Sequence, residues 1–529
     1  MRRVRAWLLW GVGVLAVATT LKAFDHRGPL VPGWLAYLVL SGVCAGLMWL
    51  AWRSVARDGF DRGLAAALIA AFALRLGVGI AMLQLLPVYG YDTRHQRAGY
   101  FFPDAYERDL DAQMLAASDR PLLTALTDRT VSDQYGGLLF ISATVYRLLS
   151  PEVSHPLLIV LLAATVSSLG VLFTSGFSGM IAGHRAAALA AWLVALYPDS
   201  ILLGASQMRE PFVATGLALA LCGYARLRLG ATRPGVAAIV LGTFLGMLIS
   251  PPYGLLIAGA VFLAWIWEGW ADSRRTAWAL GLLAVGALAA LALTIRAWAS
   301  ISSAPEGSLL NLFSWWLSSG ARYQLYVLER GSGMVQALFQ RTPEWAHMPM
   351  ATAYGLLRPF LPAALTEPAA PLAQTIQIFR SLGWVSLLPF LIYAPFAAFR
   401  RSDRGSLPAF LVLLVWGTAI LASYRAGGDD WDNVRYRTVF LVAQVALASW
   451  AWARARRSGS PWLGRIGVLV GGIMLLFLQW YAGRYFGTPR LELWGTLGAV
   501  GVFLLLWLAG SLLLDRSRRR RLTSHTPGV

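Results

Sequence analysis

The chain has 529 residues, of which 57% are hydrophobic and only 13% are charged, and its mean hydropathy is +0.58. A soluble protein carries about 25% charged residues, so this composition excludes an ordinary soluble globule. The net charge of +19 comes from arginines grouped between apolar runs. That grouping is typical of a membrane protein and argues against nucleic-acid binding.

Apolar runs of about 20 residues, the length that crosses about 30 Å of hydrocarbon, recur along the chain. They predict an all-α polytopic integral membrane protein with about 14 transmembrane helices. The basic start, Met1 to Arg5, is interpreted as the beginning of an uncleaved first helix with a cytoplasmic N-terminus. The predicted membrane segments are 6–24, 34–52, 64–86, 156–178, 185–203, 211–228, 235–249, 253–268, 277–297, 380–399, 407–424, 437–455, 465–482 and 494–514.

The basic clusters between these segments all fall on one side of the membrane, the side of the N-terminus. The positive-inside rule therefore predicts that this side and both termini are cytoplasmic. The opposite, extracytoplasmic face receives an acidic loop at 87–155, a short loop at 199–210, a long segment at 298–379 and a loop at 429–437. The clusters are Arg53/Arg57/Arg62, His184/Arg185, Arg226/Arg228/Arg233, Arg274/Arg275, Arg400/Arg401/Arg404, Arg454/Arg456/Arg457 and Arg516 to Arg521.

This topology divides the chain into four parts. They are two N-terminal helices (1–63), a core that includes the acidic loop (64–297), an extracytoplasmic or interfacial segment (298–379), and C-terminal helices with a basic tail (380–529). Within the core, two short apolar arms meet at Ser250-Pro251-Pro252, which predicts a hairpin that turns at the outer surface. The interfacial segment is expected to hold helices around Tyr323–Phe339 and Met350–Leu361.

The acidic loop contains the first candidate site, a predicted short helix that begins at Pro103. On such a helix Asp104, Glu107, Arg108 and Asp111 share one face, because they are three, four and seven residues apart. Asp104 falls in the first turn, where the helix dipole favours an ionised carboxylate that can act as a base or a metal ligand. The alternative is a solvated acidic helix on the membrane surface.

Arginines beside carboxylates mark two further candidates on the outer face. Arg209-Glu210 lies where a membrane helix begins, and it is either an interfacial ion pair or a phosphate-binding Arg beside a metal-binding or substrate-orienting carboxylate. Arg435 and Arg437 either pair locally with the acids at 429–432 or bind a phosphate, which Arg matches in a bidentate manner.

Arg358 is a weaker phosphate candidate. Arg75 lies inside a predicted membrane helix, where it could pair with a carboxylate, contact a lipid phosphate or form a purely structural bridge. The histidines show no metal-ligand spacing, and the absence of a Walker motif or a Gly-rich dinucleotide loop argues against a nucleotide-driven reaction.

The order of several short elements resembles the GT-C membrane glycosyltransferases, in particular those of the glycosyltransferase family 39 type. The likeness covers roughly residues 64–260, and the two N-terminal helices and Ala105, where many relatives have a second acid, depart from the pattern. The elements are Arg75 in its helix, Pro103-Asp104-Ala105-Tyr106, Tyr135-Gly136-Gly137, Tyr146-Arg147-Leu148-Leu149, Leu196-Tyr197-Pro198, Arg209-Glu210 and Arg435-Tyr436-Arg437.

The resemblance implies transfer of a sugar from a polyprenyl-phosphate donor in the outer leaflet of a bacterial inner membrane to a hydroxyl of a glycan, lipid or protein. Asp104 would be the base, and arginines or a divalent metal held by Asp104 and Glu210 would stabilise the leaving phosphate. Alternatives are a polyprenyl-linked glycan polymerase or ligase, and a lipid or solute transporter. The expected substrate-binding residues are Glu107, Asp111, Tyr135, Arg209, Glu210, Arg358, Arg435 and Arg437.

Overall fold

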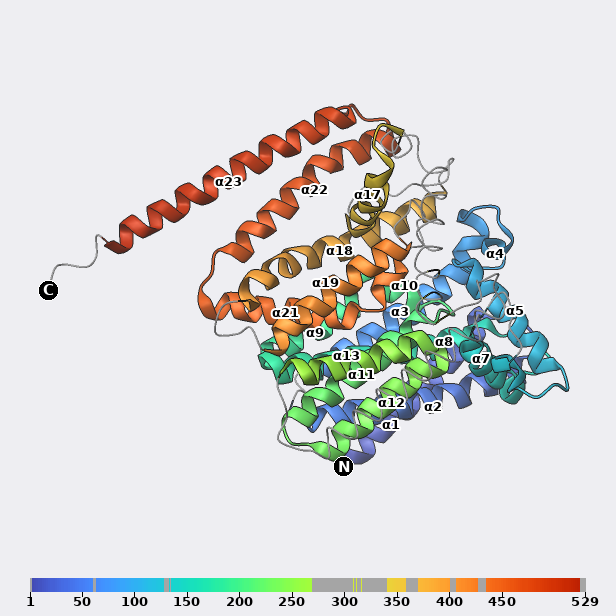
Figure 1. Cartoon of the computed structure of the whole chain (residues 1–529). Coiled ribbons are helices and arrows are strands. Elements are labelled where there is room, and N and C mark those ends of the chain that lie inside the picture. The colour runs from blue at the N-terminus through green and yellow to red at the C-terminus, as the bar shows by residue number, and fades with distance from the viewer. Residues whose placement is uncertain are drawn as a thin grey trace.

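The computed structural model describes residues 2–59, 63–127, 133, 135–268, 340–357, 370–399, 406–426 and 434–523, together with 308, 311 and 315. The regular elements of these residues are all helices (Figure 1). They are α1 (Arg2–Phe24), α2 (Leu30–Ala56), α3 (Leu64–Tyr89), α4 (Arg94–Arg97), α5 (Pro103–Ala117), α6 (Thr124–Thr127), α7 (Gly137–Leu149), α8 (Pro156–Ala182), α9 (His184–Leu196), α10 (Pro198–Gly204), α11 (Glu210–Arg228), α12 (Thr232–Ile249), α13 (Pro251–Trp267), α17 (Glu344–Leu357), α18 (Pro371–Ala398), α19 (Leu407–Ala426), α20 (Arg435–Thr438), α21 (Leu441–Ser458), α22 (Trp462–Phe486) and α23 (Leu493–Thr523).

The predicted all-helical, multi-spanning fold is confirmed. By length and composition, 8 of the described helices can cross a membrane, or up to 9 if the bent pair α9 and α10 is one span. Each predicted membrane segment overlaps a described helix, except 277–297, which lies outside the described residues. The predicted helix around Tyr323–Phe339 also lies outside them, whereas α17 overlaps the one predicted around Met350–Leu361.

Helix α18 extends beyond the predicted membrane segment 380–399. It begins nine residues earlier in the sequence, at Pro371. The Arg380 side chain is 1% exposed and forms an ion pair with Asp199 of α10, so its charge is neutralised inside the protein. A charged side chain can therefore lie within a membrane helix when it is buried against a partner of opposite charge.

Helix α8 forms the centre of the bundle, between α2, α3, α9, α11 and α21. Of its most apolar 18-residue window, 83% is buried inside the protein, against 6% for the corresponding window of α23. Helices α22 and α23 lie side by side at one edge (Figure 1). An apolar helix that is so little covered by protein is suited to contact lipid.

The predicted hairpin at Ser250-Pro251-Pro252 is confirmed by an ion pair between its two ends. Arg228 precedes α12 and Glu268 follows α13, and their Nε and Oε2 atoms are 2.8 Å apart. A single kinked helix of this length would separate its ends by about 50 Å. Gly216 lets α11 pack closely on α12, since a Cβ at this position would lie 2.6 Å from the carbonyl oxygen of Gly242.

Contacts between the helix ends also support the predicted topology. At one end of the bundle, Arg226 pairs with Asp58 at 2.6 Å, which joins the basic ends of α2 and α11. Arg457 of α21 donates a hydrogen bond to the carbonyl of Ala182, next to the predicted cluster at His184/Arg185. These pairings place basic clusters that are far apart in the sequence on a shared face. That this face is cytoplasmic stays a prediction from the charge rule.

Arg75 is a structural bridge inside the bundle. The α9–α10 pair bends by 57° at a break before Pro198. Proline has no N–H group to donate to the Val194 carbonyl, four residues earlier, and Arg75 donates to that carbonyl instead, at 3.0 Å. The hydrogen bonds of the Arg75 side chain go to oxygens of Ser167, Ser200, Ala71, Val194 and Ala195.

A buried polar cluster anchors the N-terminal helices α1 and α2 to the loop before α8. The Asp25 Oδ2 atom accepts a hydrogen bond from the Tyr37 hydroxyl at 2.6 Å and lies 2.6 Å from Nδ1 of His155. Lys22 donates to the carbonyls of Asp25 and Arg27. Burial by itself would raise the pKa of the Asp25 carboxyl, but the hydrogen bonds from His155 and Tyr37 outweigh burial and lower this pKa below its usual value.

We expect Asp25→Asn to destabilise the protein by about 1–3 kcal/mol at neutral pH, because it weakens hydrogen bonds to a charged group. A lowered carboxyl pKa stabilises the folded state above the unfolded-state pKa, and this stabilisation is lost as the pH falls through the folded-state value. The difference between variant and wild type should therefore shrink below about pH 4. Thermal unfolding in detergent at pH 7 and below pH 4 measures this. An equal loss at both pH values would contradict the electrostatic explanation.

Candidate functional site

The described part of the acidic loop forms short helices, among them α4, α5 and α7, at one end of the bundle (Figure 1). Helix α5 carries its central carboxylates. Pro103 occupies the first turn of α5, as predicted, and Asp104 follows it. The opposite face of α5 is anchored by Asp109, which accepts hydrogen bonds from the hydroxyls of Tyr100 and of Tyr146 on α7. Burial raises the pKa of the Asp109 carboxyl, and the two tyrosine hydrogen bonds oppose that rise.

Asp133 is the buried centre of the site. Its Oδ2 lies 3.6 Å from Nε of Arg108, and its Oδ1 lies 3.6 Å from Nη1 of Arg209. The carboxylate also accepts backbone hydrogen bonds from Tyr135 and Leu139, where α7 begins. A single carboxylate thus orients one arginine from α5 and another at the start of α11.

Two glycines allow the chain to turn beside Asp133. Gly136 has φ +70°, in the left-handed region, and a Cβ there would lie 1.7 Å from the Ala125 carbonyl oxygen. A Cβ on Gly137 would lie 1.8 Å from the Leu248 carbonyl oxygen, at the end of α12. Close backbone approach therefore accounts for the pair of glycines in Tyr135-Gly136-Gly137.

Arg435 connects the other two carboxylates of the site. Its Nη2 lies 2.9 Å from Oδ2 of Asp104, and its Nε lies 3.7 Å from Oε1 of Glu210. The Asp104 side chain is 40% exposed, whereas those of Glu210 and Arg435 are 9% and 10% exposed. Asp104 is therefore the carboxylate of this cluster that an incoming molecule can reach.

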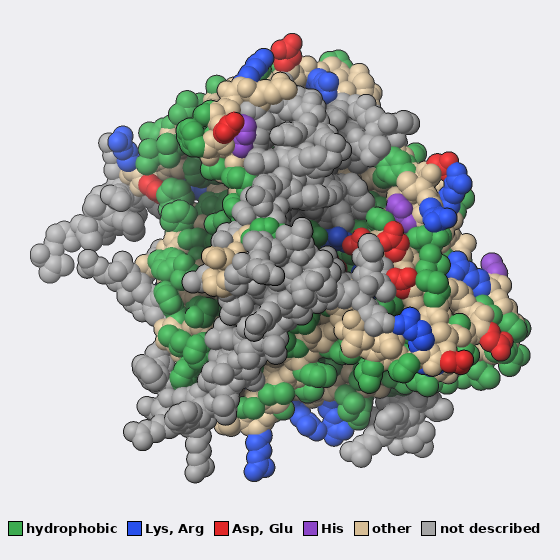
Figure 2. Space-filling model, turned by 45° about the vertical axis from the view of Figure 1, so that its right-hand side comes forward, with side chains coloured by type: hydrophobic (Ala, Val, Ile, Leu, Met, Phe, Trp, Pro, Cys, Tyr) green, Lys and Arg blue, Asp and Glu red, His purple; other side chains and the backbone are tan. Residues whose placement is uncertain are grey.

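Among the described residues, the charges at this site balance. We call it the outer ion cluster; it consists of three carboxylates and three guanidinium groups, those of Asp104, Asp133, Glu210, Arg108, Arg209 and Arg435. Burial lowers the pKa of Arg108 against the opposing charge of Asp133. Burial acts on Arg209 too, but the charges of Asp133 and Glu210 outweigh it and raise the pKa of Arg209. On the face shown in Figure 2, acidic and basic side chains gather on the right-hand side of the molecule.

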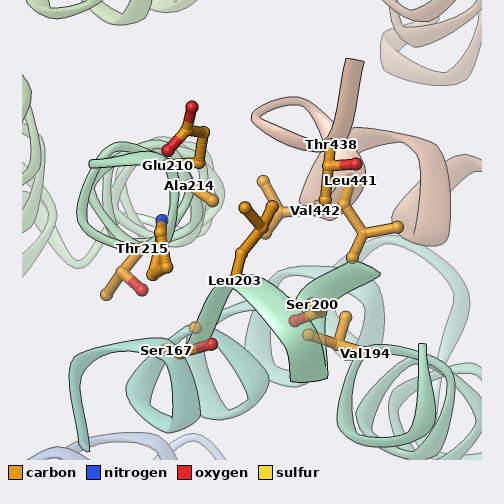
Figure 3. A pocket seen from close by; sticks show the side chains of 12 residues that line it. Ser167, Val194, Ser200, Leu203, Glu210, Ala214, Thr215, Thr438, Leu441 and Val442 are labelled. Carbon is orange, nitrogen blue, oxygen red and sulfur yellow. The ribbon is translucent and has the colours of Figure 1, made fainter. Parts of the chain in front are cut away.

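A small cavity lies beneath Glu210, between α8, α10, α11 and α21. Glu210 lies at one side of its lining, and Ser167 and Ser200, which accept hydrogen bonds from Arg75, lie at the other (Figure 3). About 20 Å³ is open to the centre of a water molecule, enough for one water and too little for a sugar. A substrate would have to bind on the more exposed side of the outer ion cluster, where Asp104 lies.

The structure brings four of the predicted site residues together, namely Asp104, Arg209, Glu210 and Arg435. Tyr135 joins them, because the Arg209 guanidinium lies over its ring at 5.6 Å. On α5, Glu107 is exposed and Asp111 is half-buried. Arg358 lies outside the described residues.

Arg437 has a different neighbourhood from Arg435. Its guanidinium stacks on the Trp384 ring at 3.6 Å and donates hydrogen bonds to the carbonyls of Gly355 and Leu356. Residues two apart on a helix point in nearly opposite directions, which separates the two arginines of α20. Arg437 thus interacts favourably with the C-terminal end of the α17 dipole.

Sequence reasoning missed two members of the outer ion cluster as site residues. The spacing placed Arg108 on the same helix face as Asp104, but nothing singled out Asp133 within the acidic loop. The available signal was position, since Asp133 lies just before the Tyr135-Gly136-Gly137 turn into α7. Asp side chains often accept hydrogen bonds from such turns and helix starts.

The residues predicted to hold a metal, Asp104 and Glu210, do not fit that role as they are placed. Arg435 lies between them and pairs with both. The third carboxylate of the cluster, Asp133, is already paired with two arginines. Within the described part of the chain, no group of three or more His, Cys, Asp or Glu side chains is placed to hold a metal ion.

Comparison with known proteins gives a distant structural likeness. No family model and no curated protein matches the sequence. Crystal structures of the Archaeoglobus fulgidus oligosaccharyltransferase in the apo form and with Zn and sulfate match with TM-scores of 0.40 and 0.41 and identities of 17% and 18%. The matches cover 85% and 78% of this chain, and 55% and 51% of those chains, so this chain spans about half their length. A likeness at this level does not establish a family, and function has to be inferred from the site.

Proposed function

We propose that this protein is a membrane glycosyltransferase of the GT-C type. It transfers a sugar from a polyprenyl-phosphate donor to an acceptor hydroxyl on the extracytoplasmic face of a bacterial inner membrane. The acceptor is a glycan, a lipid or a protein. The observation that carries the proposal is the outer ion cluster. In it an accessible carboxylate, Asp104, pairs with Arg435 from a distant part of the chain, and Arg209 lies in the same cluster, paired with Asp133.

The chemistry of the cluster suits displacement at an anomeric carbon. The acceptor oxygen bonds to that carbon, its proton passes to the Asp104 carboxylate, and the bond from the carbon to the donor phosphate breaks. The lipid phosphate leaves with the electron pair, and Arg209 and Arg435 stabilise its charge. A single displacement of this kind inverts the anomeric configuration.

Two other functions are alternatives to this proposal. A polyprenyl-linked glycan polymerase or ligase would use the same donor class, so it differs mainly in the acceptor. A transporter places its charges at mid-membrane on broken helices. This chain has such a charge at a break, Arg75, but the acceptors of its hydrogen bonds are neutral oxygens of the protein itself. The exposed carboxylate lies in the loop instead, which favours the enzyme.

The proposal is tested with the purified full chain in nanodiscs. We expect it to move radiolabel from a polyprenyl-phosphate-sugar pool into acceptors of a membrane extract, with inversion at the anomeric carbon. Retention of configuration would contradict the single displacement. Binding of the lipid without any transfer, in the presence of the full acceptor extract, would contradict the enzyme and favour transport.

Asp133→Asn is expected to lower transfer mainly by weakening donor binding. The variant removes the charge that orients Arg108 and Arg209, so the phosphate loses a positioned partner. We expect the apparent KM for the donor to rise by about tenfold or more, which corresponds to about 1.4 kcal/mol. Initial rates over a range of donor concentrations measure it, with Asp119→Asn, an exposed acid after α5, as the matched control. An unchanged KM would show that Asp133 does not contribute to donor binding.

A further inference from the structure

The guanidinium of Arg435 lies between the two carboxylates that the family resemblance offers as ligands of a divalent metal, one of the alternatives for stabilising the leaving phosphate. These carboxylates, Asp104 and Glu210, both pair with this guanidinium, at 2.9 Å and 3.7 Å. Arg435 is 10% exposed on its side chain, so it is part of the packed structure rather than a surface residue that happens to reach an acid. It carries a fixed positive charge, since a guanidinium group stays protonated in proteins.

Charge balance opposes a dication at this position. The outer ion cluster already has equal numbers of carboxylates and guanidinium groups. Counted over the described side chains, a divalent ion would add an excess of two positive charges to a largely buried site, which is costly unless anions arrive with it. The third carboxylate of the cluster, Asp133, adds no free oxygen ligand for such an ion, because it is committed to Arg108, Arg209 and two backbone N–H groups.

We propose that Arg435 takes the place of a divalent metal in this site, as a built-in cation that holds Asp104 and Glu210 together. The role of Arg435 in catalysis rests on the proposed glycosyl transfer, in which Arg435 would orient Asp104 and face the leaving phosphate. Guanidinium suits both tasks because its planar array of N–H groups can engage a carboxylate and a phosphate oxygen at the same time.

Manganese binding tests this proposal without any need for activity. The full-length protein in nanodiscs is treated with EDTA, exchanged into metal-free buffer and titrated with Mn²⁺, and free Mn²⁺ is followed by electron paramagnetic resonance. We expect no saturable binding to the wild type that depends on Asp104 or Glu210. Arg435→Ala should create such a site, with affinity at least about tenfold above the wild type, because it leaves two carboxylates without their shared cation.

Double variants identify the site that the substitution creates. Adding Asp104→Asn or Glu210→Gln to Arg435→Ala should abolish the new Mn²⁺ binding, and Arg435→Gln should behave like Arg435→Ala if the alanine variant fails to fold. The proposal is overturned if the wild type binds one Mn²⁺ and loses it in Asp104→Asn or Glu210→Gln, since the metal then displaces Arg435. Failure of both Arg435 variants to gain binding also overturns it. If donor transfer is absent while the Mn²⁺ results are as expected, the proposed function fails and the cation replacement stands.

Discussion

Replacing Asp104 by asparagine should abolish sugar transfer while leaving donor binding largely intact. Asparagine has almost the same shape as aspartate but cannot accept the acceptor proton, and loss of a general base typically slows a reaction by about 10²–10⁴-fold. The side chain lies at the exposed edge of the outer ion cluster, so the substitution buries no new group. Turnover of a radiolabelled donor and binding of the same lipid, measured on one preparation in nanodiscs, give the two quantities separately.

Asp119→Asn removes another carboxylate of the acidic loop, from an exposed position after α5, and should transfer sugar at the wild-type rate. If Asp104→Asn also turns over at the wild-type rate, Asp104 is not the base. If it loses lipid binding as much as turnover, the carboxylate acts by organising Arg435 rather than by taking a proton.

The second large effect is expected at Arg75, on stability rather than on chemistry. Arg75→Met fills similar volume but removes all the side-chain hydrogen bonds at the α9–α10 break. The Val194 carbonyl would then have no donor, because Pro198 has no N–H group. Each unsatisfied buried polar group costs about 1–3 kcal/mol, so we expect a loss of about 3 kcal/mol or more.

Thermal unfolding in detergent, followed by tryptophan fluorescence, measures this loss. Arg57→Met, at an exposed helix end, removes an arginine without breaking the bridge and should unfold like the wild type. Arg75→Lys keeps a positive charge with fewer donors and should recover part of the stability. If Arg75→Met unfolds at the wild-type temperature, the carbonyls at the α9–α10 break have hydrogen-bond donors other than Arg75.

Local sequence was enough to predict where the helices lie. Length and hydropathy located the membrane helices, Pro103 marked the start of α5, and the proline pair after Ser250 marked the hairpin. These features act through nearest neighbours: an apolar run of sufficient length spans the membrane, and a proline fits the first turn of a helix. The ion pair between Arg380 and Asp199 could not be predicted in this way, since the two residues are distant in the sequence.

The composition of the candidate site was only partly predictable. Charged residues are uncommon in this hydrophobic chain, so those in its outer loops indicated a function. This selected Asp104, Arg209, Glu210 and Arg435. The sequence did not indicate that Arg435 pairs with Asp104 while Arg437 stacks on Trp384, nor that Asp133 holds two arginines. Such pairings depend on which helix ends meet in space, and no local pattern reports that.

The sequence by itself therefore determined an all-helical membrane protein with a carboxylate-rich loop, because hydropathy and charge act along the chain. Only the tertiary structure decided which charges neutralise one another. It made Arg75 a bridge across a broken helix and joined Asp104, Arg435 and Glu210. The reason is physical: a charge in a weakly polar environment is stable only beside a suitable partner, and packing of distant segments selects that partner.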